Sequence, residues 1–285
     1  MATDGWQVPQ GSMPLEFLPE LDVPEAAQQR RWTILLRWLL LIPQFIVVWV
    51  LSVLAIPAVI VGWFGALFIG RLPEPIEEYL SGFVAWDTRV RASAMLLVDD
   101  YPPFAWRPED YPVRVELRPG ELNRLAVFFR LILMIPAAIV QGLVVTGWYA
   151  VAFIVWLIAL ILGRMPDPLF GATAATLRYA MRFSAYALML TSAYPKRLFG
   201  DDGLPPVAAA RSATRPLILS GGAKALVVVF LVLGLIGGIS RTFVDYDDDN
   251  GYSLRPPGRT STAAASPRQT VAATAANPLT AGSRP

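Results

Sequence analysis

The sequence predicts an all-α membrane protein built from two tandem copies of one hydrophobic module, followed by a separate C-terminal transmembrane helix. Composition is the first reason, because 55% of the 285 residues are hydrophobic and only 16% are charged. One soluble domain cannot bury so much apolar surface, so a bilayer is the natural solvent. An internal repeat is the second reason, since the chain aligns with itself without a gap when it is shifted by 93 residues.

The repeat starts where Leu18-Pro19 falls on Tyr111-Pro112 and closes where Tyr101-Pro102 falls on Tyr194-Pro195. The residues of the first copy that recur in the second between these points include Arg31, Arg37, Ile42, Pro43, Trp63, Gly70, Arg71, Pro73, Pro75 and Arg89. Each copy therefore has an arginine, an apolar run, Ile-Pro, a second apolar run with a tryptophan, Gly-Arg-x-Pro, an arginine-bearing helix and Tyr-Pro.

This order of motifs resembles the domain of unknown function 4389, a bacterial membrane family, and the resemblance covers residues 13–200 as two copies. The family has no established activity, so the resemblance implies a membrane fold and no particular reaction. In that family a histidine often follows the Ile-Pro pair. Here Gln44 and Ala137 stand at these positions, so no imidazole role carries over.

The apolar stretch of each repeat predicts a transmembrane helical hairpin. It runs from Trp32 to Ile69 and from Leu125 to Leu162, and a single helix of that length would reach about 57 Å against a hydrocarbon core of about 30 Å. We therefore expect a turn within 52–57 in the first copy and within 141–147 in the second. Pro43 and Pro136 are expected to kink the first helix of each hairpin, because proline lacks the amide donor.

An amphipathic helix is predicted after Gly-Arg-x-Pro, over 76–98 and 169–190, because apolar residues recur there at helical spacing. Arginines in its middle favour a position in the membrane interface. Asp87 and Arg91 are four residues apart and can form an ion pair. Short alternating patterns before each repeat indicate strands over 18–23 and 111–117, which can pair with each other across the pseudo-symmetry axis.

These elements divide the chain into a disordered N-terminus (1–12), repeat one (13–105), repeat two (106–200), a linker (201–221), a transmembrane helix (222–241) and a disordered tail (242–285). Of the 24 lysines and arginines, 19 lie between Arg30 and Lys224 and none lies at a predicted hairpin tip. The positive-inside rule then predicts a multi-pass plasma-membrane protein with a cytoplasmic N-terminus and an extracytoplasmic tail.

The sequence contains neither cysteine nor histidine. Thiolate and imidazole catalysis, the usual zinc sites and haem ligation through either residue are therefore excluded. No nucleophile motif or phosphate-binding glycine loop frames the remaining polar residues. We expect a protein that is not an enzyme, with no metal, no cofactor and no nucleic-acid partner.

Candidate contact residues are of two kinds. Basic side chains around the amphipathic helices either anchor the protein by the positive-inside effect or bind anionic lipid head groups, and they are Arg71, Arg89, Arg91, Arg164, Arg178 and Arg182. Gly234 and Gly238 form a small-xxx-small spacing in the last membrane helix, which allows close helix packing or dimerisation.

Two functions remain open at this level. The first is a non-enzymatic membrane scaffold or accessory protein that contacts lipid, a membrane-protein partner or a second copy, and the scarcity of deep intramembrane charges favours it. The alternative is a small-solute or ion transporter or channel built from inverted repeats, which requires the amphipathic segments to span and gives seven transmembrane helices instead of five. The loops 106–118 and 201–215 lie on the same side of the membrane in the first case and on opposite sides in the second.

Overall fold

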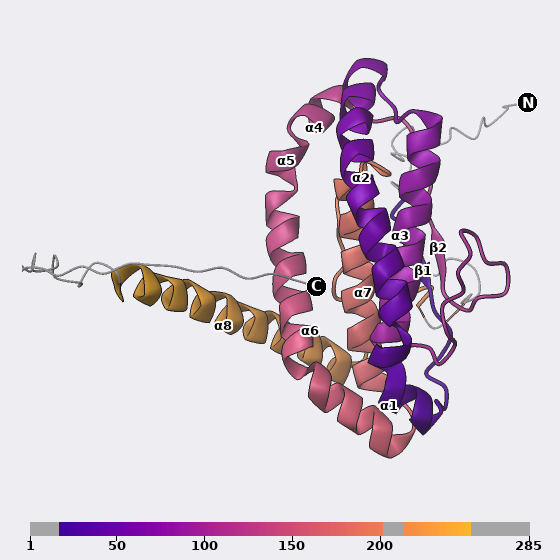
Figure 1. Cartoon of the computed structure of the whole chain (residues 1–285), viewed down its shortest axis with the longest axis vertical. Coiled ribbons are helices and arrows are strands. Elements are labelled where there is room, and N and C mark those ends of the chain that lie inside the picture. The colour runs from indigo at the N-terminus through magenta and orange to yellow at the C-terminus, as the bar shows by residue number, and fades with distance from the viewer. Residues whose placement is uncertain (1–16, 202–211, 213, 252–285) are drawn as a thin grey trace, which may run out of the picture. The chain divides into compact units, whose positions relative to one another are not determined.

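The computed structural model describes residues 17–201, 212 and 214–251. The predicted N-terminal segment and most of the linker and tail lie outside the described residues. The elements, in chain order, are β1 (Glu20–Asp22), α1 (Arg31–Leu40), α2 (Ile42–Ile69), α3 (Glu74–Ala94), β2 (Arg114–Glu116), α4 (Arg124–Phe128), α5 (Arg130–Leu133), α6 (Ile135–Leu162), α7 (Asp167–Ala187) and α8 (Gly221–Gly251). Figure 1 shows their arrangement.

The internal duplication is visible in the helix boundaries. Helices α2 and α6 each have 28 residues, and α3 and α7 each have 21, with both pairs beginning 93 positions apart. Gly70 and Gly163 end α2 and α6 in the left-handed conformation, with φ of +83° and +69°, which glycine adopts without steric cost. Each glycine is followed by an arginine, and two residues later Pro73 or Pro166 precedes the first residue of the next helix. Gly-Arg-x-Pro is therefore the corner between the two long helices of each repeat.

The predicted hairpin turns are wrong. Helix α2 continues unbroken through 52–57 and α6 through 141–147. Neither segment carries a glycine-proline turn signal strong enough to interrupt an apolar helix. The Ser52 hydroxyl donates to the carbonyl of Trp49 within the same helix (2.7 Å). Pro57 lies inside α2 without ending it. A long apolar helix can adjust to a bilayer by tilting or bending instead of folding back.

The helix breaks lie at the two Ile-Pro motifs. Leu41 separates α1 from α2, and Met134 separates α5 from α6, so Pro43 and Pro136 each occupy the second position of a long helix. At that position the missing amide proton removes no intrahelical hydrogen bond, which makes proline a favourable helix starter. Three segments are long and apolar enough to cross a membrane, namely Arg31–Ile69, Arg130–Leu162 and Gly221–Gly238, among the residues the structure describes.

The two repeats hold each other through equivalent hydrogen bonds. The indole of Trp63 donates to the carbonyl of Val127 (3.1 Å), and the indole of Trp156 donates to that of Ile34 (2.9 Å). Each donor and each acceptor has its counterpart 93 positions away. The backbone repeats the exchange, with Leu122 donating to Gly70 and Gln29 donating to Gly163, both at 2.8 Å.

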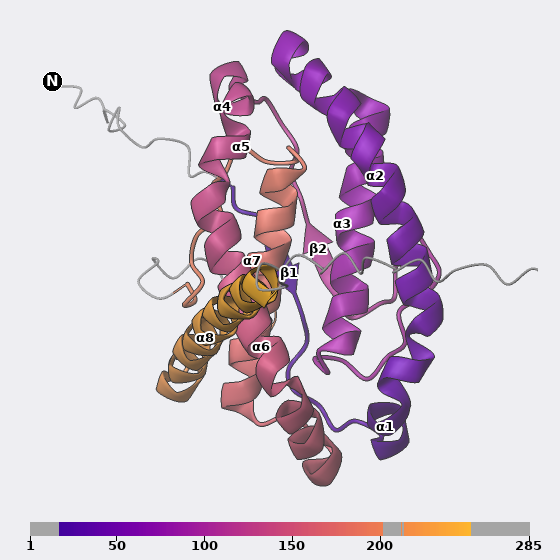
Figure 2. The same cartoon turned by 60° about the vertical axis from the view of Figure 1, so that its left-hand side comes forward.

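This reciprocity defines a pseudo-twofold axis. The start of each repeat packs on the end of the long helix of the other, because α1 contacts α6 and α4 contacts α2. Helices α2 and α6 are therefore antiparallel, and the axis lies perpendicular to them. Figure 2 is close to a view along this axis, with α2 and α6 on opposite flanks and α3 and α7 between them.

The predicted strands form and pair with each other. Strands β1 and β2 make an antiparallel ribbon in which Leu21 lies opposite Val115, with Glu20 opposite Glu116 and Asp22 opposite Arg114. Because the 93-residue shift exchanges the Leu21–Val115 pair with the Asp22–Arg114 pair, the axis passes through the ribbon between these two pairs. The ribbon lies alongside α3 and α7, away from their ends (Figure 1).

Helices α3 and α7 form where amphipathic helices were predicted, and both pack inside the protein. Helix α3 contacts α2, α7 contacts α6, and the two contact each other. Fifteen of the 21 residues of α7 are buried, against ten in α3. By contrast, α1, α2 and α4–α6 expose large apolar side chains, among them Trp49, Phe68, Phe128, Leu131 and Phe153.

Helix α8 begins near α7 and crosses α6 closely. A Cβ atom placed on Gly147 would lie 1.7 Å from the carbonyl oxygen of Phe230, and one on Gly234 would lie 2.0 Å from that of Leu143. Only glycine permits these approaches of the two backbones. The helix extends to Gly251, past its predicted end at residue 241.

Candidate functional site: a groove between α3 and β2

A groove of about 640 Å³ lies between α3 and β2. One wall is the face of α3 that carries Glu74, Glu77, Glu78, Ser81, Ala85 and Arg89. The opposite wall consists of β2 and the loops on either side of it, and its residues include Trp106, Arg107, Val113, Val115 and Leu117. Polar and apolar side chains therefore face each other across an open channel, as in sites that bind a ligand with both characters.

An aromatic cluster closes one side of the groove. Trp106 stacks on Tyr79, with ring centroids 5.8 Å apart, and lies 5.9 Å from Trp86. Its indole occupies the space above Gly82, where an added Cβ would come within 2.1 Å of the ring. Glycine at position 82 is therefore what lets the loop lie down on α3 and form the groove.

Two buried polar atoms of the groove have no hydrogen-bond partner among the described residues: the hydroxyl of Ser81 and Nε of Arg89. Arg89 is only 5% exposed, and its Nη2 donates to the carbonyls of Ala105 and Trp106 at 3.0 and 3.4 Å. A buried polar atom without a partner costs stability unless something else satisfies it. Both donors are thus available to an acceptor that enters the groove.

Carboxylates gather where α3 begins. Glu74 and Glu77 lie in the first turn, where the positive end of the helix dipole favours negative charge. Burial and the neighbouring charge of Glu74 raise the pKa of Glu77 above its ordinary value. Glu78, one residue further, forms an exposed ion pair with Arg107 at 3.0 Å. A cation that entered this end of the groove would relieve the repulsion between Glu74 and Glu77.

Three of the six arginines predicted to contact lipid are buried structural residues. Arg182 donates from Nε to the carbonyl of Pro19 (2.9 Å) and from Nη1 to that of Lys196 (3.1 Å). Arg178 donates to the carbonyl of Arg197 and pairs with the buried carboxylate of Asp201 at 2.5 Å. Together with Arg89, they bind the loops that follow α3 and α7 to the helices, so lipid contact by these three has no support in the geometry.

The other three arginines are accessible. Arg71 and Arg164 are exposed at the two Gly-Arg-x-Pro corners, where Arg124 and Arg31 approach the preceding glycines, so each corner carries two arginines, one from each repeat. Arg91 forms the expected pair with Asp87 at 2.7 Å and keeps 42% of its side chain exposed. Lipid contact stays a prediction for this accessible set.

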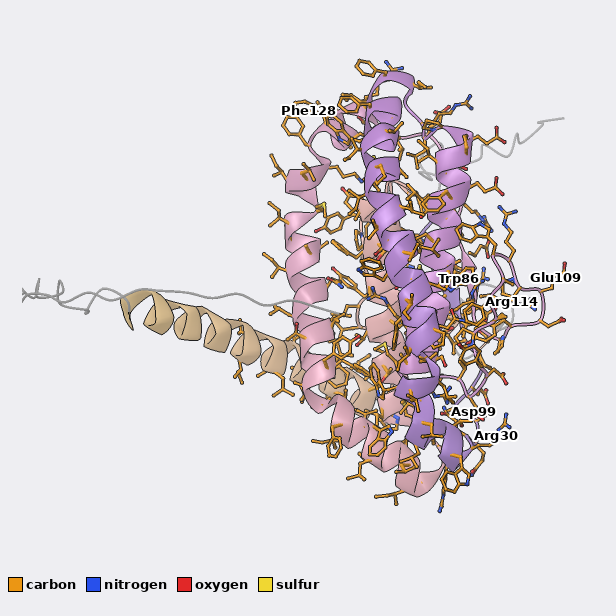
Figure 3. All side chains as sticks on the ribbon, viewed as in Figure 1. Arg30, Trp86, Asp99, Glu109, Arg114 and Phe128 are labelled. Atoms are coloured by element: carbon orange, nitrogen blue, oxygen red, sulfur yellow. The ribbon has the colours of Figure 1, made fainter. Side chains whose placement is uncertain are left out.

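Two further arginines, Arg37 and Arg130, occupy equivalent buried positions with different partners. Arg37 pairs with Asp99 (3.1 Å), which also accepts from Arg30 (Figure 3). The position equivalent to Asp99 in the second repeat is Ser192. Arg130 donates instead to the carbonyl of Thr191 and lies 4.1 Å from the ring of Tyr186. The repeats have therefore diverged in chemistry while keeping their geometry.

Of the two predicted packing glycines, Gly234 packs on α6 of the same chain, whereas a Cβ on Gly238 would meet no atom within 4 Å.

No group of three or more metal-binding side chains occurs among the described residues. Sequence reasoning missed the groove, because its walls come from segments about thirty positions apart whose only shared signal is the polar face of α3.

The fold defines a helical protein with an internal duplication and segments apolar enough to cross a membrane. The family described as domain of unknown function (DUF4389) matches the chain twice, at residues 31–105 and 124–198. These matches cover more than half of the chain, which therefore belongs to that family as two tandem copies. No curated protein and no solved structure matches it.

Proposed function

We propose that the chain is a non-enzymatic membrane scaffold or accessory protein. In this proposal α1, α2 and α4–α6 lie against the lipid with their apolar faces, and the ribbon β1–β2 with the groove faces water, where a partner can reach it. The apolar and polar sides of the molecule are segregated, with Phe128 on one flank and Glu109 and Arg114 on the other (Figure 3).

One observation carries the proposal: the loop after α3 and the segment before α8 meet on the same face. Arg215 forms ion pairs with Glu20 of β1 and with Glu116 of β2, the latter at 2.6 Å. This contact supports a placement of both segments on the same side of the membrane. That placement is the one expected for a scaffold with both repeats in the same orientation.

The position of the ribbon supports the same orientation. If α2 and α6 crossed the bilayer along its normal, the pseudo-twofold axis would lie in the membrane plane and the ribbon at mid-depth. Glu20, Asp22, Arg114, Glu116 and Arg215 would then be placed there, together with an open sheet edge. Charged groups and unpaired strand edges are too costly in hydrocarbon.

With the axis along the membrane normal, this conflict disappears. Helices α2 and α6 then lie in the interface with one face in the acyl region, both arginine corners lie at the same depth, and α8 supplies the segment that crosses. This orientation puts the polar loops of both repeats on one side of the membrane, which the distribution of arginines predicts to be the cytoplasmic side.

The transporter or channel is the second candidate, and the antiparallel arrangement of α2 and α6 favours it. Spanning helices related by an axis in the membrane plane are inverted repeats, as in many secondary transporters. This reading requires the ribbon to line a water-filled path. The two candidates thus differ in where α2 and α6 begin and end relative to the membrane.

Single cysteines decide between them, because the natural chain has none. Gln28 and Glu121 are exposed, lie 93 positions apart, and belong to opposite ends of the long helices. We expect Gln28→Cys and Glu121→Cys both to react with an impermeant maleimide only after permeabilisation. Reaction of one from outside and the other from inside would refute the scaffold orientation and support inverted repeats.

A further inference from the structure

We propose that the groove between α3 and β2 binds an extended segment of a partner protein, which adds to β2 as a strand and brings a basic residue to Glu74 and Glu77. The inference deepens the proposed scaffold function and rests on it, because the groove must face water to be reached. Its starting point is the equivalent groove of the second repeat, which the chain fills with its own residues.

The second repeat shows what such a groove accommodates. There α7 takes the place of α3, and Gly171 takes the place of Glu78. A Cβ on Gly171 would lie 3.3 Å from Leu219 and 3.2 Å from Ala223. Asp201 donates its amide to the carbonyl of Leu217 (2.9 Å), and Leu217 donates its amide to the Asp201 carboxylate (3.0 Å). Leu217 and Leu219 are buried, so this segment fills the cavity.

The same segment covers the outer edge of β1. Thr214 accepts from the amide of Val23 (2.9 Å) and donates to the carbonyl of Leu21 (2.7 Å). Because alternate residues of an antiparallel pair point toward and away from the partner strand, Leu21 and Val23 direct these groups away from β2. The hydroxyl of Thr214 thus pairs with two backbone groups at the outer edge of β1 that would otherwise lack a partner.

Strand β2 also has an outer edge, and no residue that the structure describes covers it. Leu21 lies opposite Val115, so Val115 also directs its amide and carbonyl away from the ribbon, and Leu117 follows just past the end of the strand. Both residues line the groove. Among the described residues, none donates to or accepts from these outward backbone groups. An extended peptide laid along β2 would pair with them, which is the recognition mode of strand addition.

The facing wall, on α3, supplies hydrogen-bond donors for the side of the peptide that does not pair with β2. The hydroxyl of Ser81 and Nε of Arg89 are buried, unpartnered donors, suited to the carbonyls of an extended chain. In the second repeat the filling segment continues past Leu219 to Gly222, where an added Cβ would lie 3.4 Å from Pro168, the counterpart of Pro75. The next residues of a peptide in the first repeat would therefore reach Glu74 and Glu77, which favour a cation there.

The probe is a fluorescent peptide with the sequence of residues 214–224, Thr-Arg-Pro-Leu-Ile-Leu-Ser-Gly-Gly-Ala-Lys, titrated with the full chain in lipid nanodiscs. We expect saturable binding that weakens about tenfold in the double variant Glu74→Gln/Glu77→Gln, an effect of the size given by removing charge partners at an interface. Ala85→Trp, which fills the groove, should abolish binding. Glu121→Gln removes an exposed carboxylate outside the groove and should bind like the natural chain.

Three results overturn the inference: no binding to the natural chain, binding that survives Ala85→Trp, or binding unaffected by the glutamine pair. The glutamine pair alters only side chains at the surface of the first turn, so it decides the matter even if Ala85→Trp does not fold. Absence of binding together with same-side labelling of the Gln28 and Glu121 variants removes the peptide site and leaves the scaffold. Opposite-side labelling removes the scaffold itself.

Discussion

Arginine is the residue whose role changes most between sequence and structure. In the sequence, Arg89, Arg178 and Arg182 are basic side chains near a membrane, and anionic lipid is a natural partner. In the structure, each donates from its guanidinium group to backbone carbonyls of the loops after α3 and α7, and Arg182 also donates to Pro19. A planar group with five donors can hold several loop carbonyls at once, which lysine cannot do. These arginines therefore fix the loops that build the groove and its filled counterpart.

The buried pair of Arg178 and Asp201 gives a stability prediction. Their side chains are 2% and 9% exposed, so neither charge has water to replace a lost partner. Asp201→Asn leaves a buried guanidinium uncompensated, and we expect it to lower the free energy of unfolding by about 3–5 kcal/mol. Chemical unfolding in detergent, followed by tryptophan fluorescence, measures this difference.

The matched control is Glu78→Gln, which breaks the exposed pair with Arg107, whose side chains are 60% and 73% exposed. Solvent screens such a pair, and its loss should cost at most about 1 kcal/mol. Equal effects of the two substitutions would show that Asp201 does not neutralise a buried charge.

At the scale of elements, close helix packing depends on individual glycines. The crossing of α6 and α8 uses Gly147 on one helix and Gly234 on the other, because a Cβ at either would overlap a carbonyl of the partner helix. The small-xxx-small spacing is typical of dimerisation, but here Gly234 serves packing within one chain. Helix α8 is thus docked onto the second repeat rather than tethered to it.

We predict that Gly147→Ala and Gly234→Ala each destabilise the docking of α8 by about 1–3 kcal/mol, the usual cost of overpacking. Gly238→Ala is the control, since its Cβ would meet no atom within 4 Å. The readout is disulfide formation between cysteines substituted at Thr146 and Gly237, because a Cβ on Gly237 would lie 3.8 Å from Cγ2 of Thr146. The bond should form within one chain and fail in the first two variants; a crosslink between chains would contradict intramolecular docking.

At the scale of the whole molecule, the pseudo-twofold axis relates two arginine corners. With the axis along the membrane normal, the Arg71 and Arg164 corners meet the head groups of the same leaflet. Near an anionic surface, a basic residue contributes about 1 kcal/mol of attraction. The accessible arginines then act together, one corner at each end of the apolar face.

We predict that Arg71→Gln and Arg164→Gln lower the retention of anionic lipid by the purified protein by similar amounts, and that the double variant shows the sum. Mass spectrometry of lipid copurified from mixed anionic and zwitterionic bilayers gives the measurement. Arg107→Gln makes the same charge change on the polar side and should leave retention unaltered. An effect from Arg107→Gln as large as that of the corners would indicate a general charge effect instead.

The sequence by itself determined the duplication, the helical class, the paired strands before each repeat and the corner at Gly-Arg-x-Pro. Each of these depends on local chemistry: apolar periodicity, a glycine that ends a helix in the left-handed conformation, and a proline that starts the next. A shift of the chain against itself was enough to reveal the duplication, and the family match confirms the two copies.

Only the tertiary structure decided that α2 and α6 run unbroken and that three of the predicted lipid contacts are buried. It also decided that one groove is filled, while its twin is open among the residues that the structure describes. These features depend on contacts between residues far apart in the chain. Gly171 has no side chain and leaves room for Leu219 and Ala223 to pack on α7, whereas its counterpart Glu78 forms an ion pair with Arg107. No local pattern records such an encounter, because burial and hydrogen bonding are properties of the packed neighbours and not of the segment that carries the residue.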